Sequence, residues 1–173
     1  MQVRVDPLTD PRVIALLEEH LAHMRETTPA EHVFALDVGR LQAPGITFFT
    51  AWEGDELLGC GALRELAPDH GEVKSMRTPS ARRGRGAGRA ILDHLIAEAR
   101  RRGYRRLSLE TGTHPAFGPA QALYRSAGFA PCGPFGEYAV SPDNTFFALD
   151  LALPTIPTSR LDPRLESPAR DAS

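Results

Sequence analysis

The chain has 173 residues, a formal net charge of −2 and 42% hydrophobic residues. This length and composition predict one water-soluble domain, and the near-neutral charge argues against a nucleic-acid-binding protein. No apolar run reaches the ~20 residues that cross a bilayer and no apolar leader opens the chain, so we expect a cytoplasmic protein without a membrane partner.

The first half of the chain predicts a strand, two helices and a three-stranded meander. Val3 and Val5 form a short strand ahead of a helix that begins after Asp10, an N-cap residue followed by proline. A second helix is predicted over residues 31–41. Acidic and glycine-containing turns then join three predicted strands, at residues 46–52, 57–66 and 72–78.

The second half of the chain predicts alternating helices and strands. After a glycine-rich turn, apolar residues share one face of a helix that stops at Gly103; these are Ile91, Leu92, Leu95, Ile96 and Ala99. The remaining elements are a strand at 106–110, a helix at 118–127 and strands at 129–132 and 145–151. This order predicts a mixed sheet in an α/β or α+β domain over residues 1–153. Residues 154–173, rich in proline and charge, predict a disordered tail.

The segment 82–89 places three alternate glycines and four arginines between a strand and a helix. Glycines remove the side chains that would keep a ligand away from backbone N–H groups, and a helix N-terminus adds donors and a positive dipole end. Arginine side chains supply further positive charge. The segment therefore predicts a phosphate or pyrophosphate site.

Three phosphate-binding patterns can be compared with this turn. A P-loop requires Lys followed by Ser or Thr after the glycines, and no such pair is present. The dinucleotide pattern Gly-x-Gly-x-x-Gly does not fit glycines that are two residues apart. The third pattern, Arg/Gln-x-x-Gly-x-Gly/Ala, matches residues 83–88.

With this motif and with Leu-Tyr-x-x-x-Gly-Phe at residues 123–129, the chain resembles the GNAT superfamily of acetyl-CoA-dependent N-acetyltransferases. The resemblance covers most of residues 3–151. The segments Gly-Cys-Gly-Ala-Leu at 59–63 and Leu-Ser-Leu-Glu-Thr-Gly at 107–112 are similar to small bacterial members of the YsnE-like type. The resemblance implies a GNAT-type fold, with a central mixed, largely antiparallel sheet flanked by about four helices.

The resemblance also implies where acetyl-CoA, the co-substrate, would bind. Backbone N–H groups of the glycine turn would hold the pyrophosphate, and the end of the preceding strand would pair with the pantetheine arm. A backbone N–H of that strand would polarise the thioester carbonyl. The implied coenzyme-binding residues are Met76, Arg77, Thr78, Arg83, Gly84, Arg85, Gly86, Ala87, Gly88 and Arg89.

Two catalytic roles follow from the same resemblance, for direct transfer of the acetyl group to a primary amine of a small molecule or protein. Tyr124 would protonate the departing thiolate of coenzyme A. Glu72 would deprotonate the attacking ammonium, with Glu110 as the alternative carboxylate. One departure is Phe117, which stands where many relatives carry an asparagine that contacts the coenzyme.

Several alternatives remain open at the level of sequence. A non-catalytic acyl-CoA-binding or sensor domain would keep the glycine turn, and a nucleic-acid-binding module would use its arginines, although no aromatic residue is interleaved with them. His20 and His23 could face a pocket. The acceptor could contact Arg25, Arg64 and Arg77.

Members of the family that the chain resembles often form dimers, so a homodimer is a further expectation. The two cysteines, Cys60 and Cys132, lack metal-ligand spacing, so we expect free thiols and no metal.

Overall fold

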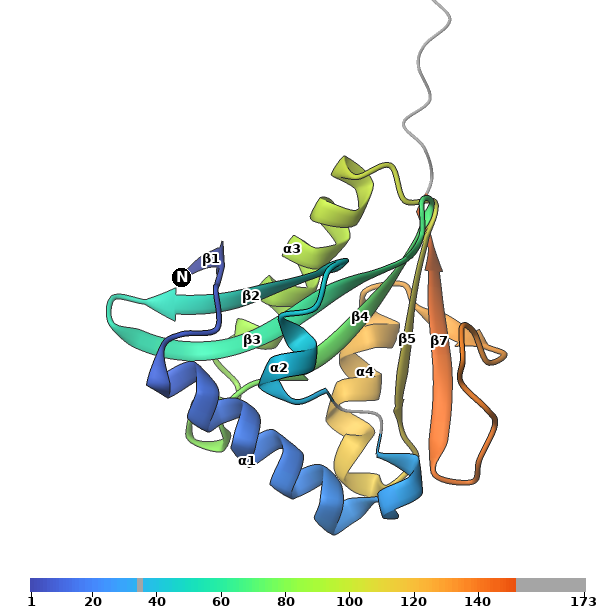
Figure 1. The fold of residues 1–173 in the computed structure, drawn as a ribbon, viewed down its shortest axis with the longest axis horizontal. Helices are drawn as coiled ribbons and strands as arrows, with labels where there is room; N and C mark the ends of the chain where they lie inside the picture. Colours follow the sequence, from blue (N-terminus) through green and yellow to red (C-terminus); the bar gives the residue numbers. More distant parts are fainter. Residues whose placement is uncertain (34–35, 152–173) are drawn as a thin grey trace, which may run out of the picture.

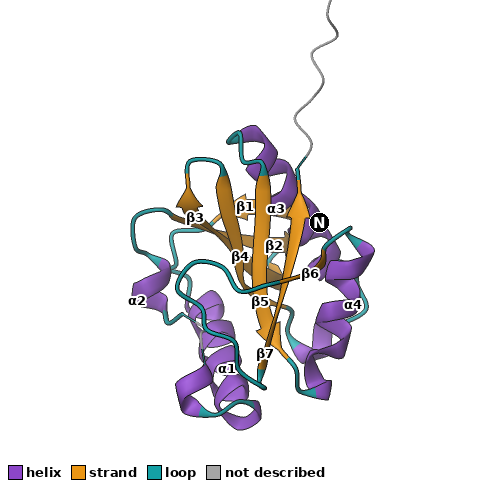
Figure 2. Cartoon of the chain, turned by 90° about the vertical axis from the view of Figure 1, so that its right-hand side faces the viewer, coloured by secondary structure: helices purple, strands orange, loops and turns teal. Residues whose placement is uncertain are grey.

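A seven-stranded sheet with strand order β1-β2-β3-β4-β5-β7-β6 forms the centre of the molecule (Figures 1 and 2). The structure, a computed structural model, describes residues 1–33 and 36–151. Its strands are β1 (Gln2–Val5), β2 (Ile46–Glu53), β3 (Glu56–Ala67), β4 (His70–Arg77), β5 (Arg106–Gly112), β6 (Ala130–Cys132) and β7 (Asn144–Asp150). Only β4 and β5 are parallel among the neighbouring strands of this part of the chain, so the predicted mixed, largely antiparallel sheet is confirmed.

Four α-helices within the described residues flank this sheet. They are α1 (Pro11–Thr27), α2 (Val38–Leu41), α3 (Ala87–Arg101) and α4 (Gly118–Ser126), with short 3-10 turns η1 (Ala30–His32), η2 (Ser80–Arg82) and η3 (Pro115–Phe117). Figure 2 shows α1 and α2 on one side of the sheet and α4 on the other. Within these residues the structure contains no helix with the length and apolar character needed to span a bilayer.

The two faces of the sheet bury separate apolar clusters, because successive strand residues point to opposite faces. Phe49 of β2 packs against His94 of α3 and belongs to the same buried cluster as Tyr124 of α4. Its neighbour Phe48 packs on the opposite face with Val13 and Leu17 of α1. Helices on both faces cover the sheet, and a continuous buried segment therefore makes up half of each of the strands β3 and β4.

Helix α3 forms where the sequence predicts it. Its predicted apolar stripe is buried in the core, consisting of Ile91, Leu92, Leu95, Ile96 and Ala99. The helix ends in a Schellman arrangement, in which Gly103, at a φ of +81°, donates to Arg100 and Tyr104 donates to Ala99. At the other end Gly86, at a φ of +80°, caps the helix and turns the chain out of the preceding loop.

Strand β4 carries an irregularity in its middle that no sequence signal predicts. Lys74 pairs with Ala62 of β3 and Arg77 pairs with Cys60, so two β4 residues stand opposite one residue of β3. Ser75, within this bulge, has a φ of +52°, a left-handed conformation that is rare for serine. The parallel pairing of β4 with β5 ends before the bulge, at Glu72. The two strands therefore separate at this point.

One predicted helix is wrong in the part that the structure describes. In place of a continuous helix over 31–41, the chain forms η1, an extended Val33 and then the short α2. Asp37 accepts a hydrogen bond from the backbone N–H of Arg40 at 2.8 Å, and such an N-cap starts a new helix instead of continuing an earlier one. Residues 34–35 and the predicted tail at 154–173 lie outside the described residues.

Candidate active site

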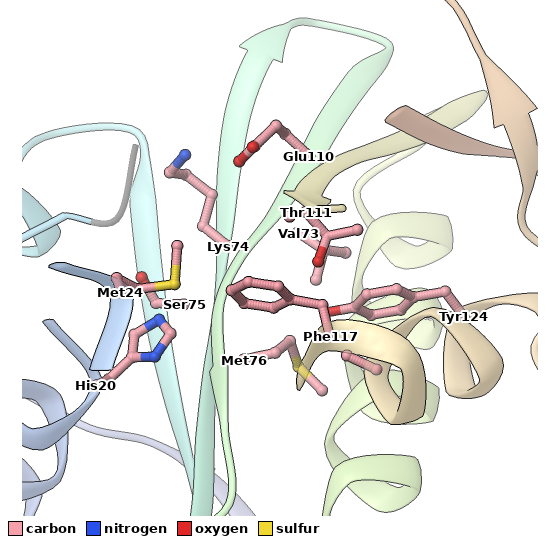
Figure 3. A pocket seen from close by; sticks show the side chains of 12 residues that line it. His20, Met24, Val73, Lys74, Ser75, Met76, Glu110, Thr111, Phe117 and Tyr124 are labelled. Atoms are coloured by element: carbon pink, nitrogen blue, oxygen red, sulfur yellow. The ribbon is translucent and has the colours of Figure 1, made fainter. Parts of the chain in front are cut away.

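A pocket opens where β4 and β5 separate, between α1 on one side and α4 on the other (Figure 3). Its acidic and phenolic groups come from different elements, Glu110 from β5 and Tyr124 from α4. The residues that line it are His20, Met24, Val73, Lys74, Ser75, Met76, Glu110, Thr111, Gly112, Phe117, Ala120 and Tyr124. The separation of the two strands thus brings an acidic, a phenolic and several apolar side chains around one space.

Glu110 has the protonation behaviour of a general base. Burial raises the pKa of its carboxyl group to about 7; the positive charge of Lys74 opposes this rise and the negative charge of Glu72 adds to it. A carboxylate whose pKa lies near neutral pH can accept a proton and release it again without a large driving force in either direction. The alternative base proposed from the sequence therefore lines the pocket with suitable acidity.

Tyr124 lies opposite, on α4, and its ring packs against Phe129 with centroids 6.1 Å apart. Burial raises the pKa of its phenol above the ordinary value of 10, and the negative charge of Glu110 raises it further. The hydroxyl consequently keeps its proton at physiological pH. It can serve as a hydrogen-bond and proton donor within the pocket, the role that its sequence context implied.

Glu72, predicted as the catalytic base, occupies a different position. It is fully buried and is not among the residues that line the pocket. Its carboxylate accepts hydrogen bonds from Lys74 Nζ, at 3.0 Å, and from the hydroxyl of Tyr138, and it faces Arg64 Nη1 at 3.6 Å. A carboxylate with these three partners holds Lys74 in place at the wall of the pocket.

Sequence inspection missed Lys74 and Tyr138 as partners of Glu72. Tyr138 lies in the segment between β6 and β7, 66 positions from Glu72 along the chain, and no local pattern connects the two. Lys74 follows Glu72 by two residues, a spacing that places both side chains on one face of a strand. That spacing is the only sequence signal that could have indicated the pair.

The end of β4 leads from the pocket toward the glycine turn. Met76 lines the pocket, whereas Arg77 turns its side chain toward α1 and contacts Glu19 at 3.0 Å. The hydroxyl of Thr78 lies 3.7 Å from the point where a side chain on Gly88 would begin. The three predicted residues at this strand end thus lie along one path between the pocket and α3.

The glycine turn has the open backbone that a pyrophosphate requires. Gly84 and Gly86 have φ values of +79° and +80°, and a Cβ at either position would meet no atom within 4 Å. The first helical hydrogen bond of α3 runs from Ala90 to Gly86, so the N–H groups ahead of residue 90 precede the helical ladder. These donors and the helix dipole suit an anion.

The arginines of this turn are mostly held in ion pairs at the surface. Arg85 contacts Glu53 and Glu56, and Arg82 also contacts Glu56. Arg89 pairs with Asp93 within α3. Because exposed ion pairs of this kind contribute little stability, the arginines can exchange these partners for phosphate oxygens.

Phe117 forms an apolar wall of the pocket in place of the asparagine that many relatives carry. Its ring packs directly on Gly112, where even a Cβ would lie 2.4 Å from a ring carbon. Gly112 is therefore the β5 residue that allows Phe117 to occupy this position. Within the described residues, no group of three or more side chains is arranged to bind a metal ion.

Comparison with known proteins agrees with this geometry. The acetyltransferase (GNAT) family matches residues 13–129. The uncharacterized N-acetyltransferase YsnE of Bacillus subtilis (strain 168) is 48% identical over 87% of this chain and its own whole length. The uncharacterized N-acetyltransferase YedL of Escherichia coli (strain K12) is 44% identical over 86% of this chain and 94% of its own.

Solved structures share the fold at lower identity. A structure from Klebsiella pneumoniae superimposes with a TM-score of 0.70 at 27% identity and covers 87% of this chain and 97% of its own. A Bacillus subtilis acetyltransferase in complex with CoA has a TM-score of 0.63 at 19% identity and covers 87% and 99% of the two chains. The chain therefore belongs to the acetyltransferase (GNAT) family, as a small member of the YsnE-like type. The predicted class, an acetyl-CoA-dependent N-acetyltransferase, is confirmed.

Leucine in place of Gly88 is expected to weaken coenzyme A binding. A Cβ at this position would lie 3.3 Å from Leu123 Cδ2, and the rest of a leucine side chain would fill the space beside the α3 N-terminus. Loss of one charge-assisted hydrogen bond predicts about a 10- to 100-fold weaker affinity. Isothermal titration with coenzyme A measures this change.

Gly39→Leu is the matched control for this substitution. Gly39 lies in the first turn of α2, and a Cβ there would make only an ordinary contact, 3.5 Å from Asp37 Oδ1. The control should bind coenzyme A as the wild type does. Unchanged affinity in Gly88→Leu would mean that the pyrophosphate is held elsewhere.

Proposed function

We propose that this protein transfers the acetyl group of acetyl-CoA directly to a primary amine, inside the pocket between β4 and β5. The observation that carries the proposal is the presence in one pocket of a carboxylate with a pKa near 7, Glu110, and a protonated phenol, Tyr124. When the environments of two neighbouring titratable groups give them different pKa values, one group can act as the base of a reaction and the other as the acid.

The donor would lie along the path from the glycine turn to the pocket. Backbone N–H groups of residues 83–89 would hold the pyrophosphate, and the end of β4 from Met76 to Thr78 would pair with the pantetheine arm. This placement is supported by the separation of β4 from β5, which leaves the β4 backbone beyond Glu72 without a partner on that side. The thioester would then reach the pocket beside Met76.

The reaction would proceed without a covalent intermediate on the protein. The amine nitrogen attacks the thioester carbon while Glu110 takes one proton from it, and a backbone N–H of β4 stabilises the oxyanion. The C–S bond then breaks, and Tyr124 donates its proton to the departing thiolate. Apolar side chains such as Met24 and Phe117 keep bulk water away from the thioester.

Under this proposal Glu72 has a supporting role. It holds Lys74 in place, and Lys74 in turn places a positive charge near Glu110. We therefore assign proton abstraction to Glu110 and not to Glu72. The two carboxylates can be separated by mutagenesis, because only one of them is bound in a buried ion pair.

The cellular setting and assembly are further parts of the proposal. Cys60 and Cys132 are free, which is typical of a reducing cytoplasm. The formal net charge of −2 supports a role in coenzyme binding over one in nucleic-acid binding. A second copy, if present, would pair with β1, because Pro131 removes a backbone donor from the edge strand β6. Size-exclusion chromatography of the whole chain tests that assembly.

A turnover screen tests the proposed function. Acetyl-CoA would be incubated with the protein and with amino acids, polyamines, aminoglycosides and peptides, and released thiol and acetylated product would both be measured. We expect acetylation of at least one class of primary amine. Saturable coenzyme A binding without transfer to any amine would instead identify a non-catalytic acyl-CoA-binding domain.

A further inference from the structure

The buried polar atoms that lack hydrogen-bond partners lie on β4 and on the neighbouring helix α1. Within the described residues they number four, three on β4 and one on α1 beside it. They are His20 Nδ1, Glu72 Oε2, Ser75 Oγ and Arg77 Nε. Buried polar groups in folded proteins are almost always hydrogen-bonded, so a cluster of exceptions indicates where a ligand supplies the missing partners.

Two of these atoms belong to residues that line the pocket, His20 and Ser75 (Figure 3). Ser75 lies in the β4 bulge at a φ of +52°, a strained conformation for serine. Its buried hydroxyl has no hydrogen-bond partner within the described residues. Strain that the fold does not use is typical of binding sites. His20 faces this strand from α1.

His20 is neutral at physiological pH and does not act as a base. Burial, with a smaller contribution from the positive charge of Arg77, lowers the pKa of its imidazole to about 4. In a neutral imidazole one ring nitrogen is a donor and the other an acceptor. The positive charge of Arg77 nearby favours the tautomer in which Nδ1 carries the lone pair, and we assign Nδ1 on this ground as the nitrogen that accepts a hydrogen bond from a ligand.

The cations around the pocket are already occupied. Lys74 donates to Glu72 and to Tyr138, and Arg77 contacts Glu19. The walls beside His20 and Ser75 are apolar, formed by Met24, Met76 and Phe117. Among the residues that the structure describes, the pocket thus lacks an uncommitted cation for an acidic acceptor, and beside His20 and Ser75 it offers polar atoms within apolar walls.

We propose that His20 and Ser75 select the acceptor, binding a hydroxyl or N–H group that neighbours the reacting amine on an otherwise apolar molecule. The inference rests on the proposed function, since it concerns the acceptor of the same pocket. His20 Nδ1 accepts a hydrogen bond from the hydroxyl or N–H group of the acceptor. Ser75 Oγ forms a second hydrogen bond with the same group. Both residues determine specificity and take no part in the proton transfers.

Two matched pairs of amines test the proposal through turnover. Phenethylamine is compared with phenylethanolamine, and propylamine with ethanolamine; one member of each pair carries a hydroxyl group, which is added in the first pair and replaces the terminal methyl group in the second. We expect the hydroxylated member to have the higher kcat/KM by about tenfold, the contribution of one buried hydrogen bond. The preference should vanish in His20→Leu and return in part in His20→Asn, whose amide oxygen occupies nearly the place of Nδ1.

His94→Leu is the control, a matched substitution on α3 of a histidine whose ring packs against Phe49 and does not line the pocket. It should keep the preference of the wild type. Ser75→Ala should reduce the preference while the melting temperature stays equal or rises, because the substitution removes a buried hydroxyl without a partner. A lower melting temperature with an unchanged preference would mean that Ser75 has a structural role only, and would overturn its part in the proposal.

Binding is followed separately, through the ¹⁵N resonance of His20 Nδ1 in protein that is saturated with coenzyme A. We expect this resonance to shift with ethanolamine or phenylethanolamine and not with the matched partners. A shift without turnover of any amine would contradict the proposed function and support this inference. Turnover without a shift, or the absence of both, would overturn the inference.

Discussion

Replacing Glu110 by glutamine lowers kcat/KM for amine acetylation by about 100- to 10,000-fold, the contribution typical of a general base. Glutamine has nearly the same shape but cannot accept the proton of the ammonium. Glu110 lies in the pocket and not in the glycine turn, so the affinity for coenzyme A should be nearly unchanged. Steady-state kinetics and calorimetry with coenzyme A measure the two quantities.

The pH dependence of the wild type provides an independent check of this role. The pKa of Glu110 is raised to about 7, so kcat/KM should rise as the pH increases through 7 and the carboxylate forms. Glu110→Gln should lack this rise. Repeating the profile with amines of different basicity separates the ionisation of the enzyme from that of the substrate. A profile of Glu110→Gln that is identical to the wild type would contradict the assignment.

The free energy of unfolding is expected to change in opposite directions when Glu110 and Glu72 are replaced by glutamine. Because the folded-state pKa of Glu110 lies above its ordinary value of 4.5, the free energy of unfolding falls as the pH rises from about 4.5 to 7. Glu110→Gln removes this loss and should be at least as stable as the wild type at pH 8. Denaturant titrations at pH 5 and pH 8 measure the difference.

Glu72→Gln should behave in the opposite way. It leaves the buried ammonium of Lys74 without its counter-charge, and breaking a buried pair of this kind destabilises a protein by about 3–5 kcal/mol. At a temperature where the variant remains folded, it should keep a rise of activity near neutral pH. A stable Glu72→Gln protein without that rise would return the base role to Glu72.

Tyr124→Phe lowers kcat by about 100-fold or more and leaves acetyl-CoA affinity nearly unchanged. The phenol is buried and its pKa is raised, so in the wild type it retains the proton that the thiolate of coenzyme A requires. Phenylalanine preserves the ring that packs against Phe129 and removes only the hydroxyl. Rapid-quench measurement of a single turnover reports the chemical step directly.

Tyr104→Phe is the matched control for Tyr124. Tyr104 is also buried, but its hydroxyl donates to Glu65 at 3.1 Å and it does not line the pocket. We expect normal turnover in this variant, apart from a small loss of stability. Unchanged turnover in Tyr124→Phe would exclude the general-acid role.

The parts of the site that depend on local sequence could be predicted. The glycine turn, the buried stripe of α3 and the place of Tyr124 ahead of Gly128 are each encoded within a few neighbouring residues, and the structure has the turn and the stripe where they were expected. Local patterns of this kind hold because hydrogen bonding and side-chain periodicity act over one or two turns.

The relative positions of the two carboxylates could not be predicted. The sequence predicted Glu72 as the base, yet it is buried with Lys74 of its own strand, Arg64 of β3 and Tyr138 of the segment between β6 and β7 as partners. The bulge at Ser75 uses a serine where a positive φ usually requires glycine, so the sequence carried no signal for it. The separation of β4 and β5, which forms the pocket, depends on contacts between distant parts of the chain and not on neighbouring residues.

The most direct test of the account is initial-velocity kinetics on an acetylated amine, with acetyl-CoA and the amine both varied and the product identified by mass spectrometry. Direct transfer within one pocket predicts intersecting double-reciprocal lines and an acetylated amine formed in step with free coenzyme A. Parallel lines, with an acetylated protein as intermediate, would contradict direct transfer, and coenzyme binding without any acetylated amine would contradict the enzymatic function itself.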